Sequence, residues 1–216
     1  MPKSLIIAID GPSASGKGTV AKKIAAHFNL PHLDTGSLYR LVAFRVLQQK
    51  IALEDFAAHL DSLTQNISTD PTPNEELSNE EVGAVASMIA KNPLLRQKLF
   101  TLQKQFVENG INKNGGAVLD GRDTTTVICP DANYKFFITA DVEIRAKRRF
   151  EQLHSQGKNV NYEEILTQLK KRDENDIGRK DSPLLIAQDA IVINNGNLNI
   201  EEGLQKCLSF IKNTKT

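Results

Sequence analysis

Short apolar runs alternate with longer stretches of helical periodicity along this chain. The run SLIIAID at residues 4–10 is apolar and rich in branched side chains, as in a strand buried on both faces of a parallel sheet. Runs at residues 115–119, 134–138 and 190–193 have the same character, and residues 30–33 allow a short strand. Because helical patterns separate these runs, the sequence predicts an α/β fold with a mostly parallel sheet of about five strands.

Apolar residues spaced three and four positions apart predict the helices between the strands. At Asn92-Pro93 a capping side chain is followed by a proline at the first helical position, and Asn161 with Glu164 resembles a capping box. The predicted helices cover residues 19–28, 35–50 and 53–66, two stretches after the polar segment STDPTPNEELSNEE, and stretches that begin after Asp141, at Asn161, at Ser182-Pro183 and at Ile200.

The composition is that of an ordinary soluble globular protein. Of 216 residues, 40% are hydrophobic and 25% are charged, and the net charge of +1 argues against a nucleic-acid coat or a polybasic membrane binder. No stretch reaches the roughly 18 apolar residues of a membrane helix, and the run Leu5–Ile9 ends at Asp10, unlike a signal peptide. Cys129 and Cys207 lie far apart, unlike a zinc ribbon or disulfide scaffold. We expect a cytoplasmic monomer without nucleic-acid or membrane partners.

The charges are unevenly distributed. Residues 51–90 contain eight acidic residues and neither Lys nor Arg, so the rest of the chain has 27 basic and 18 acidic residues. Such a block indicates either a solvated insert beside an anion-binding body or a helix pair with an acidic outer face. The basic surplus matters only if the body contains a phosphate site.

A phosphate site is predicted directly after the first strand. The glycines of a GxxxxGK loop let the backbone curl so that successive N–H groups face a phosphate, and the following helix adds partial positive charge at its N-terminus. Lys17 can reach the outer phosphates, and strand, loop, lysine and helix all agree with a nucleoside triphosphate site. The loop consists of Gly11, Pro12, Ser13, Ala14, Ser15, Gly16 and Lys17.

The residue at position 18 helps to identify the class of P-loop protein. It is Gly, where many P-loops have the Ser or Thr that binds magnesium, and the hydroxyl comes one residue later at Thr19. A GTPase would need an Asn-Lys-x-Asp guanine motif, but residues 112–115 read NKNG. The stretch GKGT is instead similar to the loop of nucleoside monophosphate kinases.

Four further motifs decide the class. They are DTGSLYR at 34–40, DGRDTTTVICPDA at 120–132, RAKRR at 145–149 and KRDENDIGRKDSPL at 171–184. With these motifs in this order, nearly the whole chain resembles the bacterial CMP kinase (cytidylate kinase) family. The resemblance implies transfer of the γ-phosphoryl group of ATP to CMP and dCMP, with Mg²⁺.

The resemblance also implies how a single P-loop kinase domain, residues 1–216, is divided. The core would comprise residues 1–50, 110–140 and 185–216. An acceptor-binding insert would occupy about 51–109, and a lid about 141–184.

The resemblance implies a set of acceptor-binding residues dominated by arginines, whose guanidinium forks can hold two phosphate oxygens at once. In the family, the counterparts of Asp123, Ser87 and Arg96 contact the base, and that of Asp176 contacts the sugar. On a continuous helix Arg172 and Arg179 would share one face. The implied acceptor residues are Thr35, Arg40, Ser87, Arg96, Arg122, Asp123, Arg172, Asp176 and Arg179.

The donor side is implied in the same way. Gly18 and Thr19 complete the ATP-binding loop, and Arg145 and Arg149 resemble lid arginines that close over ATP; Arg148 is the least expected of the three. Thr19 and Asp120 are the expected magnesium residues, Asp120 through water. The implied catalytic residues are Lys17, Asp120, Arg122, Arg172 and Arg179.

Two departures from the family pattern concern the acceptor side. Only residues 62–77 are available where the family has an insert of several short strands, so we expect a trimmed form or a loop. Thr125 replaces a frequent glycine and excludes a turn that needs positive φ there. The alternatives are another small-molecule P-loop kinase, such as an adenylate or shikimate kinase, and a non-catalytic nucleotide-binding regulator. A regulator would not need arginine clusters on both sides of the loop.

Overall fold

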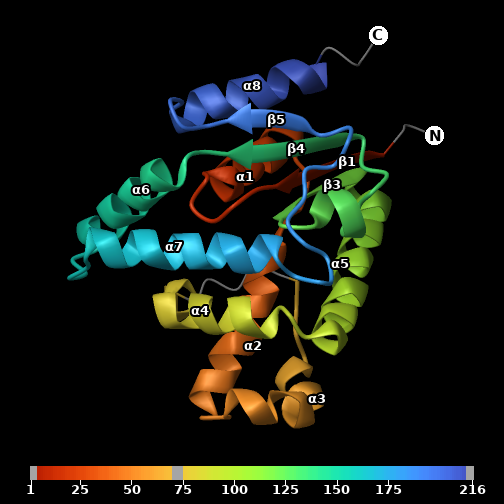
Figure 1. The fold of residues 1–216 in the computed structure, drawn as a ribbon. Helices are drawn as coiled ribbons and strands as arrows, with labels where there is room; N and C mark the ends of the chain where they lie inside the picture. Colours follow the sequence, from red (N-terminus) through yellow and green to blue (C-terminus); the bar gives the residue numbers. More distant parts are fainter. Residues whose placement is uncertain (1–3, 70–74, 213–216) are drawn as a thin grey trace.

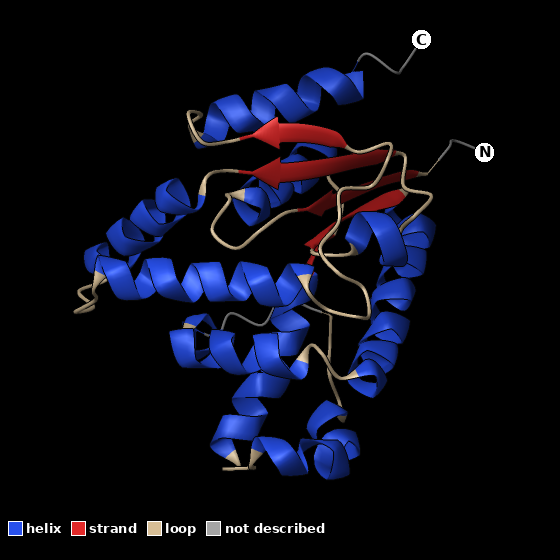
Figure 2. Ribbon diagram, viewed as in Figure 1, coloured by secondary structure: helices blue, strands red, loops and turns tan. Residues whose placement is uncertain are grey.

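Five parallel strands form one sheet in the order β2-β3-β1-β4-β5 (Figures 1 and 2). The computed structural model describes residues 4–69 and 75–212. The predicted α/β fold with five strands is therefore confirmed. The strands are β1 (Leu5–Asp10), β2 (His32–Asp34), β3 (Gly116–Gly121), β4 (Tyr134–Thr139) and β5 (Ile191–Asn194).

Both faces of the central strand β1 are buried, which explains why β1 is apolar up to its last residue, Asp10. Side chains alternate between the two faces of a strand, so Ile6 and Ala8 join the core on one side, while Ile7 and Ile9 join the core on the other. Helices α2, α3, α4 and α5 contribute to the first core, and α1 and α8 to the second. The site described below lies where β1 and β3 end.

The helices connect the strands or form two extensions beside the sheet. Helices α2, α3 and α4 form one extension, and the antiparallel pair α6 and α7 forms the other (Figure 1). The α-helices are α1 (Lys17–Phe28), α2 (Thr35–Gln48), α3 (Leu60–Thr64), α4 (Glu80–Ile89), α5 (Pro93–Asn114), α6 (Val142–Ser155), α7 (Tyr162–Ile177) and α8 (Ile200–Lys212); η1 (Leu53–His59) and η2 (Glu75–Ser78) are 3₁₀-helices, and η3 (Thr124–Ile128) is a π-helical turn.

Most predicted helix starts are confirmed. The side chain of Asn92 accepts a hydrogen bond from the N–H of Leu95 at 3.0 Å, and Asn161 accepts from Glu163 at 2.8 Å and from Glu164. Asp141 occupies the cap position of α6, although its side chain makes no capping hydrogen bond. The predicted helix at 53–66 is a 3₁₀-helix followed by the short α3.

The prediction of a helix from Ser182-Pro183 is wrong. Ser182 has φ +51°, which is outside the helical region, and no helix is assigned between residues 178 and 190. The N–H of Leu184 donates to the carbonyl of Asp176 at 2.8 Å, which folds the segment back onto the end of α7. The same contact keeps Asp176 beside this segment.

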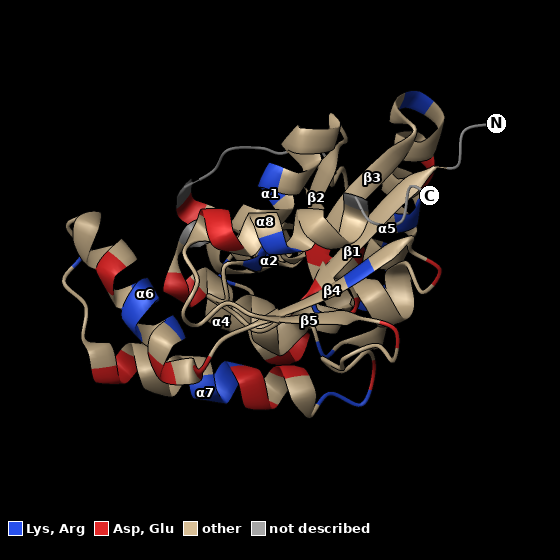
Figure 3. Ribbon diagram, turned by 90° about the horizontal axis from the view of Figure 1, so that it is seen from above, with Lys and Arg blue, Asp and Glu red and all other residues tan. Residues whose placement is uncertain are grey.

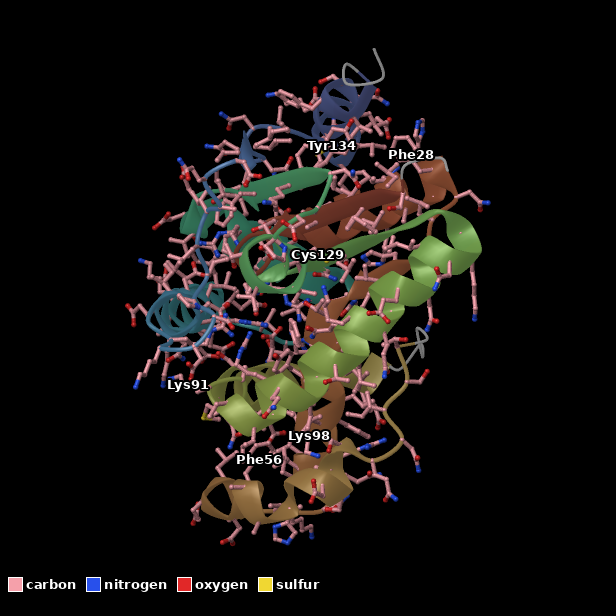
Figure 4. All side chains as sticks on the ribbon, turned by 90° about the vertical axis from the view of Figure 1, so that its right-hand side faces the viewer. Phe28, Phe56, Lys91, Lys98, Cys129 and Tyr134 are labelled. Atoms are coloured by element: carbon pink, nitrogen blue, oxygen red, sulfur yellow. The ribbon has the colours of Figure 1, made fainter. Side chains whose placement is uncertain are left out.

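The stretch at 62–77 contains no strand in its described part. It comprises the end of α3, residues 65–69 without regular structure, and η2, while residues 70–74 lie outside the described residues. Lys98 of α5 pairs with Asp61 of α3 at 2.8 Å, and Figure 4 shows Lys98 and Phe56 at this end of the molecule. Across the described ranges, no helix is both long and apolar enough to cross a membrane.

Candidate active site

The GxxxxGK loop has a strongly curved backbone between β1 and α1. Ala14 has φ +59° and Gly16 has φ +88°, so two of its residues are left-handed. Gly11 is required by close packing, because a Cβ there would lie 2.0 Å from the carbonyl oxygen of Ile138 in β4. The side chain of Asn195, after β5, donates to the carbonyl of Ser15 at 3.0 Å. The loop is therefore packed against β4 and hydrogen-bonded to the segment after β5.

Lys17 carries its charge at a poorly solvated position. Its Nζ donates to the carbonyl of Pro12 at 3.4 Å. Burial, and then the positive charge of Arg122, lower the pKa of Lys17 to about 8, although Asp120 and Asp34 act in the opposite direction. An anion beside Lys17 would relieve this penalty.

Two carboxylates stand side by side where β2 and β3 end, because Asp34 and Asp120 are paired in the parallel register. Nε2 of His32 lies 2.7 Å from Oδ1 of Asp120. The other carboxylate oxygen of Asp120 faces the first turn of α1, since a Cβ on Gly18 would lie 3.5 Å from it. Partial desolvation among its neighbours, and then the charge of Asp120, raise the pKa of Asp34, although the residue is exposed at the surface. Oxygen ligands of this kind suit Mg²⁺, which binds one or two carboxylates and retains water, so these residues fit the expected ion.

One small cavity gathers eight of the nine expected acceptor residues. Its volume is about 50 Å³, and it is bounded by α2, α4, the start of α5, the end of β3 with the segment after it, and the end of α7. These residues come from four separate parts of the sequence, and the fold brings their side chains together around one cavity. They are Thr35, Ser87, Arg96, Arg122, Asp123, Arg172, Asp176 and Arg179, and Gly36, Tyr39, Ala86, Ala90 and Gly121 complete the lining.

Asp176 is the centre of an arginine cluster in this cavity. Nε of Arg122 donates to its carboxylate at 2.7 Å, and Arg179 lies 3.9 Å from it. Burial alone would raise the pKa of Asp176, but Arg122, Arg172 and Arg179 outweigh burial and hold the pKa below its usual range. Arg179 follows the end of α7, so the continuous helix considered for Arg172 and Arg179 is absent; both nevertheless reach the same cavity.

Several polar atoms of this cavity are buried without a hydrogen-bond partner in the described part of the chain. They include Oγ of Ser87, Nε of Arg172, and Nε and Nη2 of Arg179. Burial and the charges of Arg122 and Arg40 lower the pKa of Arg172 to about 10. Buried donors that lack acceptors are costly, and a bound anion would supply those acceptors.

Arg96 and Asp123 contact each other directly as a buried ion pair. Arg96 also donates to the carbonyl of Ala90 at 3.2 Å and lies 5.6 Å from the ring centroid of Tyr39. The hydroxyl of Thr35 donates to the carbonyl of Asp120 at 2.9 Å. Asp123 and Arg96 therefore satisfy each other in this arrangement.

Arg40 borders a larger neighbouring cavity of about 640 Å³, which shares Ser87 and Arg172 with the small one. Its guanidinium donates to the carbonyl of Leu77 at 2.7 Å. It also packs on Gly83, where a Cβ would lie 3.0 Å from Nη2. The larger cavity reaches Ser13 and Ala14 of the loop, so it connects the two expected substrate sites.

The three arginines of α6 have different partners. Arg145 is 4% exposed, pairs with Asp173 at 2.6 Å and donates to the carbonyl of Ser13 at 3.1 Å. Arg148 donates to three backbone carbonyls between residues 195 and 198, which is a structural contact. Arg149 pairs with Glu80 at the start of α4. Figure 3 shows the basic and acidic segments close together on α6 and α7.

A family model described as "Cytidylate kinase" matches residues 7–213. The chain belongs to the cytidylate kinase family. A cytidylate kinase of Bartonella tribocorum is 46% identical over 215 residues, covering 97% of this chain and 95% of the relative. One of Xanthobacter autotrophicus is 44% identical over 210 residues, covering 96% and 97%. The predicted resemblance is thus confirmed.

Solved structures support the fold class independently. A shikimate kinase from Bacteroides thetaiotaomicron has a TM-score of 0.50 at 14% identity, covering 96% of this chain and 98% of that chain. An uncharacterized protein from Eubacterium ventriosum has a TM-score of 0.53 at 18% identity, covering 96% and 98%. At this identity the likeness concerns the fold alone, which is the predicted P-loop kinase type.

The sequence prediction missed four residues that contact the site. Tyr39 lines the small cavity although it is part of the quoted motif DTGSLYR. Asn195 holds the loop, and Glu80 holds Arg149. Asp10 binds the segment after Asp123, as described below. Two of these residues had a signal in the sequence: Tyr39 lies in a quoted motif, and Asp10 is a charged residue at the end of an apolar strand.

Proposed function

We propose that this protein transfers the γ-phosphoryl group of ATP to CMP, and also to dCMP. Its family membership supports an enzyme of this class and favours CMP over the AMP or shikimate of the alternative kinases. The observation that carries the proposal is the small cavity, in which eight acceptor residues expected from the family meet beside the loop. A regulator without turnover would not need this arrangement.

On the donor side, we propose that residues 11–19 hold the phosphates of ATP. Their backbone N–H groups and the N-terminus of α1 offer positive potential, and Lys17 adds a full charge. Thr19 and, through water, Asp120 would hold Mg²⁺, with Asp34 beside Asp120. The ion would neutralise phosphate charge when bound.

On the acceptor side, we propose that arginines hold the phosphate of CMP. Arg40, Arg122, Arg172 and Arg179 have the positive charge that this anion needs, and Arg172 and Arg179 also have buried donors without a partner in the described residues. No general base is required, since a phosphate oxygen is already anionic at neutral pH. Catalysis then consists of positioning two anions and compensating their charge as the phosphoryl group moves.

We propose that Asp123, Arg96 and Ser87 read the base and that Asp176 contacts the sugar. A carboxylate accepts hydrogen bonds, so Asp123 suits the amine of cytosine, whereas uracil presents a carbonyl there. Arg96 donates and suits the cytosine ring nitrogen and carbonyl. Because Arg96 and Asp123 now pair with each other, the base would have to insert between them or share them.

We propose that the parts at about 51–109 and 141–184 close over the substrates as acceptor-binding insert and lid. These parts would first have to open, because the small cavity, at about 50 Å³, is far below the 300–1,000 Å³ of usual ligand pockets, and they would close again once CMP has entered. Arg149, now paired with Glu80, would turn to ATP on closure, and Arg145 would support the loop through Ser13. We further propose that the protein works as a cytoplasmic monomer.

An acceptor panel tests the function. ADP release from Mg²⁺-ATP should be measured with AMP, UMP, CMP, dCMP, GMP and shikimate in turn. The highest kcat/KM is expected with CMP, followed by dCMP. A higher kcat/KM with AMP or shikimate, or no ADP release with any acceptor, would refute the proposal.

Asp123→Asn tests how the base is read. Asn can turn its amide donor toward the uracil carbonyl, so the ratio of kcat/KM for CMP over UMP should fall about tenfold or more. Asp176→Asn is a suitable comparison, because it changes a carboxylate of the same cavity that does not face the base in the proposed arrangement. An unchanged CMP-to-UMP ratio in Asp123→Asn would remove Asp123 from base recognition.

A further inference from the structure

The carboxylate of Asp10 is completely buried and makes four hydrogen bonds to two consecutive residues. Its Oδ1 accepts from the backbone N–H of Thr124 at 2.9 Å and from the Thr124 hydroxyl at 2.7 Å. Its Oδ2 accepts from the N–H of Thr125 at 2.7 Å and from the Thr125 hydroxyl at 2.6 Å. Asp10 is 0% exposed, and Thr124 and Thr125 are at most 1% exposed.

The carboxyl of Asp10 has no Lys or Arg partner in the described ranges, where Thr124 and Thr125 are its hydrogen-bond partners. Burial raises the pKa of this carboxyl, and the four hydrogen bonds act to lower it. A buried carboxylate costs free energy of desolvation unless hydrogen bonds satisfy it. A neutral side chain would avoid this cost if position 10 served only to end the strand. The use of a carboxylate points to a role in holding these two threonines.

The backbone of Asp10 is fixed by the sheet and cannot easily move with Thr124 and Thr125. It is the last residue of β1, the central strand, and is in register with Gly121 of β3 on one side and Phe137 of β4 on the other. Asp10 thus fixes the backbone through Gly121 and, through its side chain, at Thr124. Only Arg122 and Asp123 lie between these two attachment points.

We propose that Asp10 is a positioning residue for the acceptor: it sets the place of Arg122 and Asp123 in the small cavity. The inference rests on the proposed function, in which Arg122 holds the phosphate and Asp123 reads the base. The π-helical turn that starts at Thr124 depends on the same bonds, because Asp10 satisfies the N–H groups of Thr124 and Thr125, which have no partner within the turn. Release of Thr124 would move both acceptor residues together and leave the ATP loop in place.

The test compares KM values for the two substrates. Asp10→Asn keeps the shape but presents an N–H group to the donors of one threonine. We expect the KM for CMP to rise by about tenfold or more, since small misplacements of positioning groups have effects of this size, while the KM for ATP stays within about twofold. The increase in melting temperature produced by CMP should shrink, and that produced by ATP should remain. A general loss of structure would instead change the KM for CMP and the KM for ATP alike.

A milder variant and its matched control keep the test possible if Asp10→Asn does not fold. Thr125→Val removes one hydroxyl bonded to Asp10 and should raise the KM for CMP by roughly threefold or more, as expected for one hydrogen bond. Thr126→Val is the matched control, because the Thr126 hydroxyl is buried without a described partner in the same turn, and both KM values should be unchanged. Unchanged KM for CMP in Thr125→Val, or equal increases for CMP and ATP in either Asp10→Asn or Thr125→Val, would overturn the inference.

Failure of the proposed function would look different. If the native protein phosphorylates another nucleotide better than CMP, the proposed acceptor is wrong, and the same KM comparison made with that nucleotide still tests Asp10. If the native protein prefers CMP and the variants keep its KM, only the role of Asp10 is refuted.

Discussion

Lys17 is expected to take up a proton when ATP binds above neutral pH. Burial and Arg122 lower its pKa from 10.5 to about 8 in the ligand-free protein. The phosphates of ATP supply negative charge at this position and should bring the pKa back toward its usual value. Because the folded pKa lies below the unfolded one, charged Lys17 destabilises the ligand-free protein: stability rises with pH between about 8 and 10.5 and is lost as pH falls through about 8.

The size of the effect follows from the pKa values. The difference between 10.5 and about 8 corresponds to about 3 kcal/mol, which bound phosphate can recover. Lys17 would be about nine-tenths charged at pH 7 and about one-tenth charged at pH 9, so the Kd for ATP should rise about tenfold between these values. About half a proton should be taken up per ATP at pH 8, and about nine-tenths at pH 9.

Calorimetry of ATP binding in two buffers of different ionisation enthalpy measures this proton uptake directly. Lys17→Arg is the control, because a guanidinium stays charged throughout this range and should take up no proton. Arg172, with a pKa of about 10, stays mostly charged at these pH values and adds little to the uptake. Uptake near zero in the native protein, or equal uptake in Lys17→Arg, would refute the reasoning.

Three further outcomes are expected. Lys17→Met should lower kcat by at least about 100-fold in a protein with native circular dichroism, because it removes a charge placed for the transition state; near-native kcat would contradict the assignment. Hydrogen exchange across residues 145–180 should slow with a bisubstrate analogue, and unchanged exchange would exclude a closing lid. Gly110→Ala should lower the free energy of unfolding, measured with urea, by about 1–3 kcal/mol. The Cβ would lie 2.6 Å from the carbonyl oxygen of Gly116, and native stability would show that α5 can shift.

The regular elements were predictable because their signals are local. Asn92 and Asn161 cap helices as their spacing predicts, and the apolar run of β1 is buried on both faces. The segment after α7 was not predictable in this way. Ser182-Pro183 has the composition of a helix start, but the contact of Leu184 with Asp176 and the left-handed Ser182 override it.

Within the candidate site, residue types were predictable and their partners were not. The family resemblance supplied eight residues of the small cavity, six of them within the quoted motifs. No spacing shows that Arg96 pairs with Asp123 or that Arg149 pairs with Glu80. Thr125 was correctly expected to avoid positive φ. Its bond to Asp10 joins residues 115 positions apart, which is beyond the reach of a local pattern.

The strand order has a consequence for synthesis of the chain on the ribosome. β1 is made first but lies at the centre of the sheet, where Leu5 pairs with Gly116 and Ile7 pairs with Tyr134. A nascent chain that ends before these residues therefore has an apolar first strand without either neighbour. Such long-range pairing slows folding, and apolar, aggregation-prone segments stay exposed until it is complete. The centre of this sheet can therefore be completed only after β4 has left the ribosome.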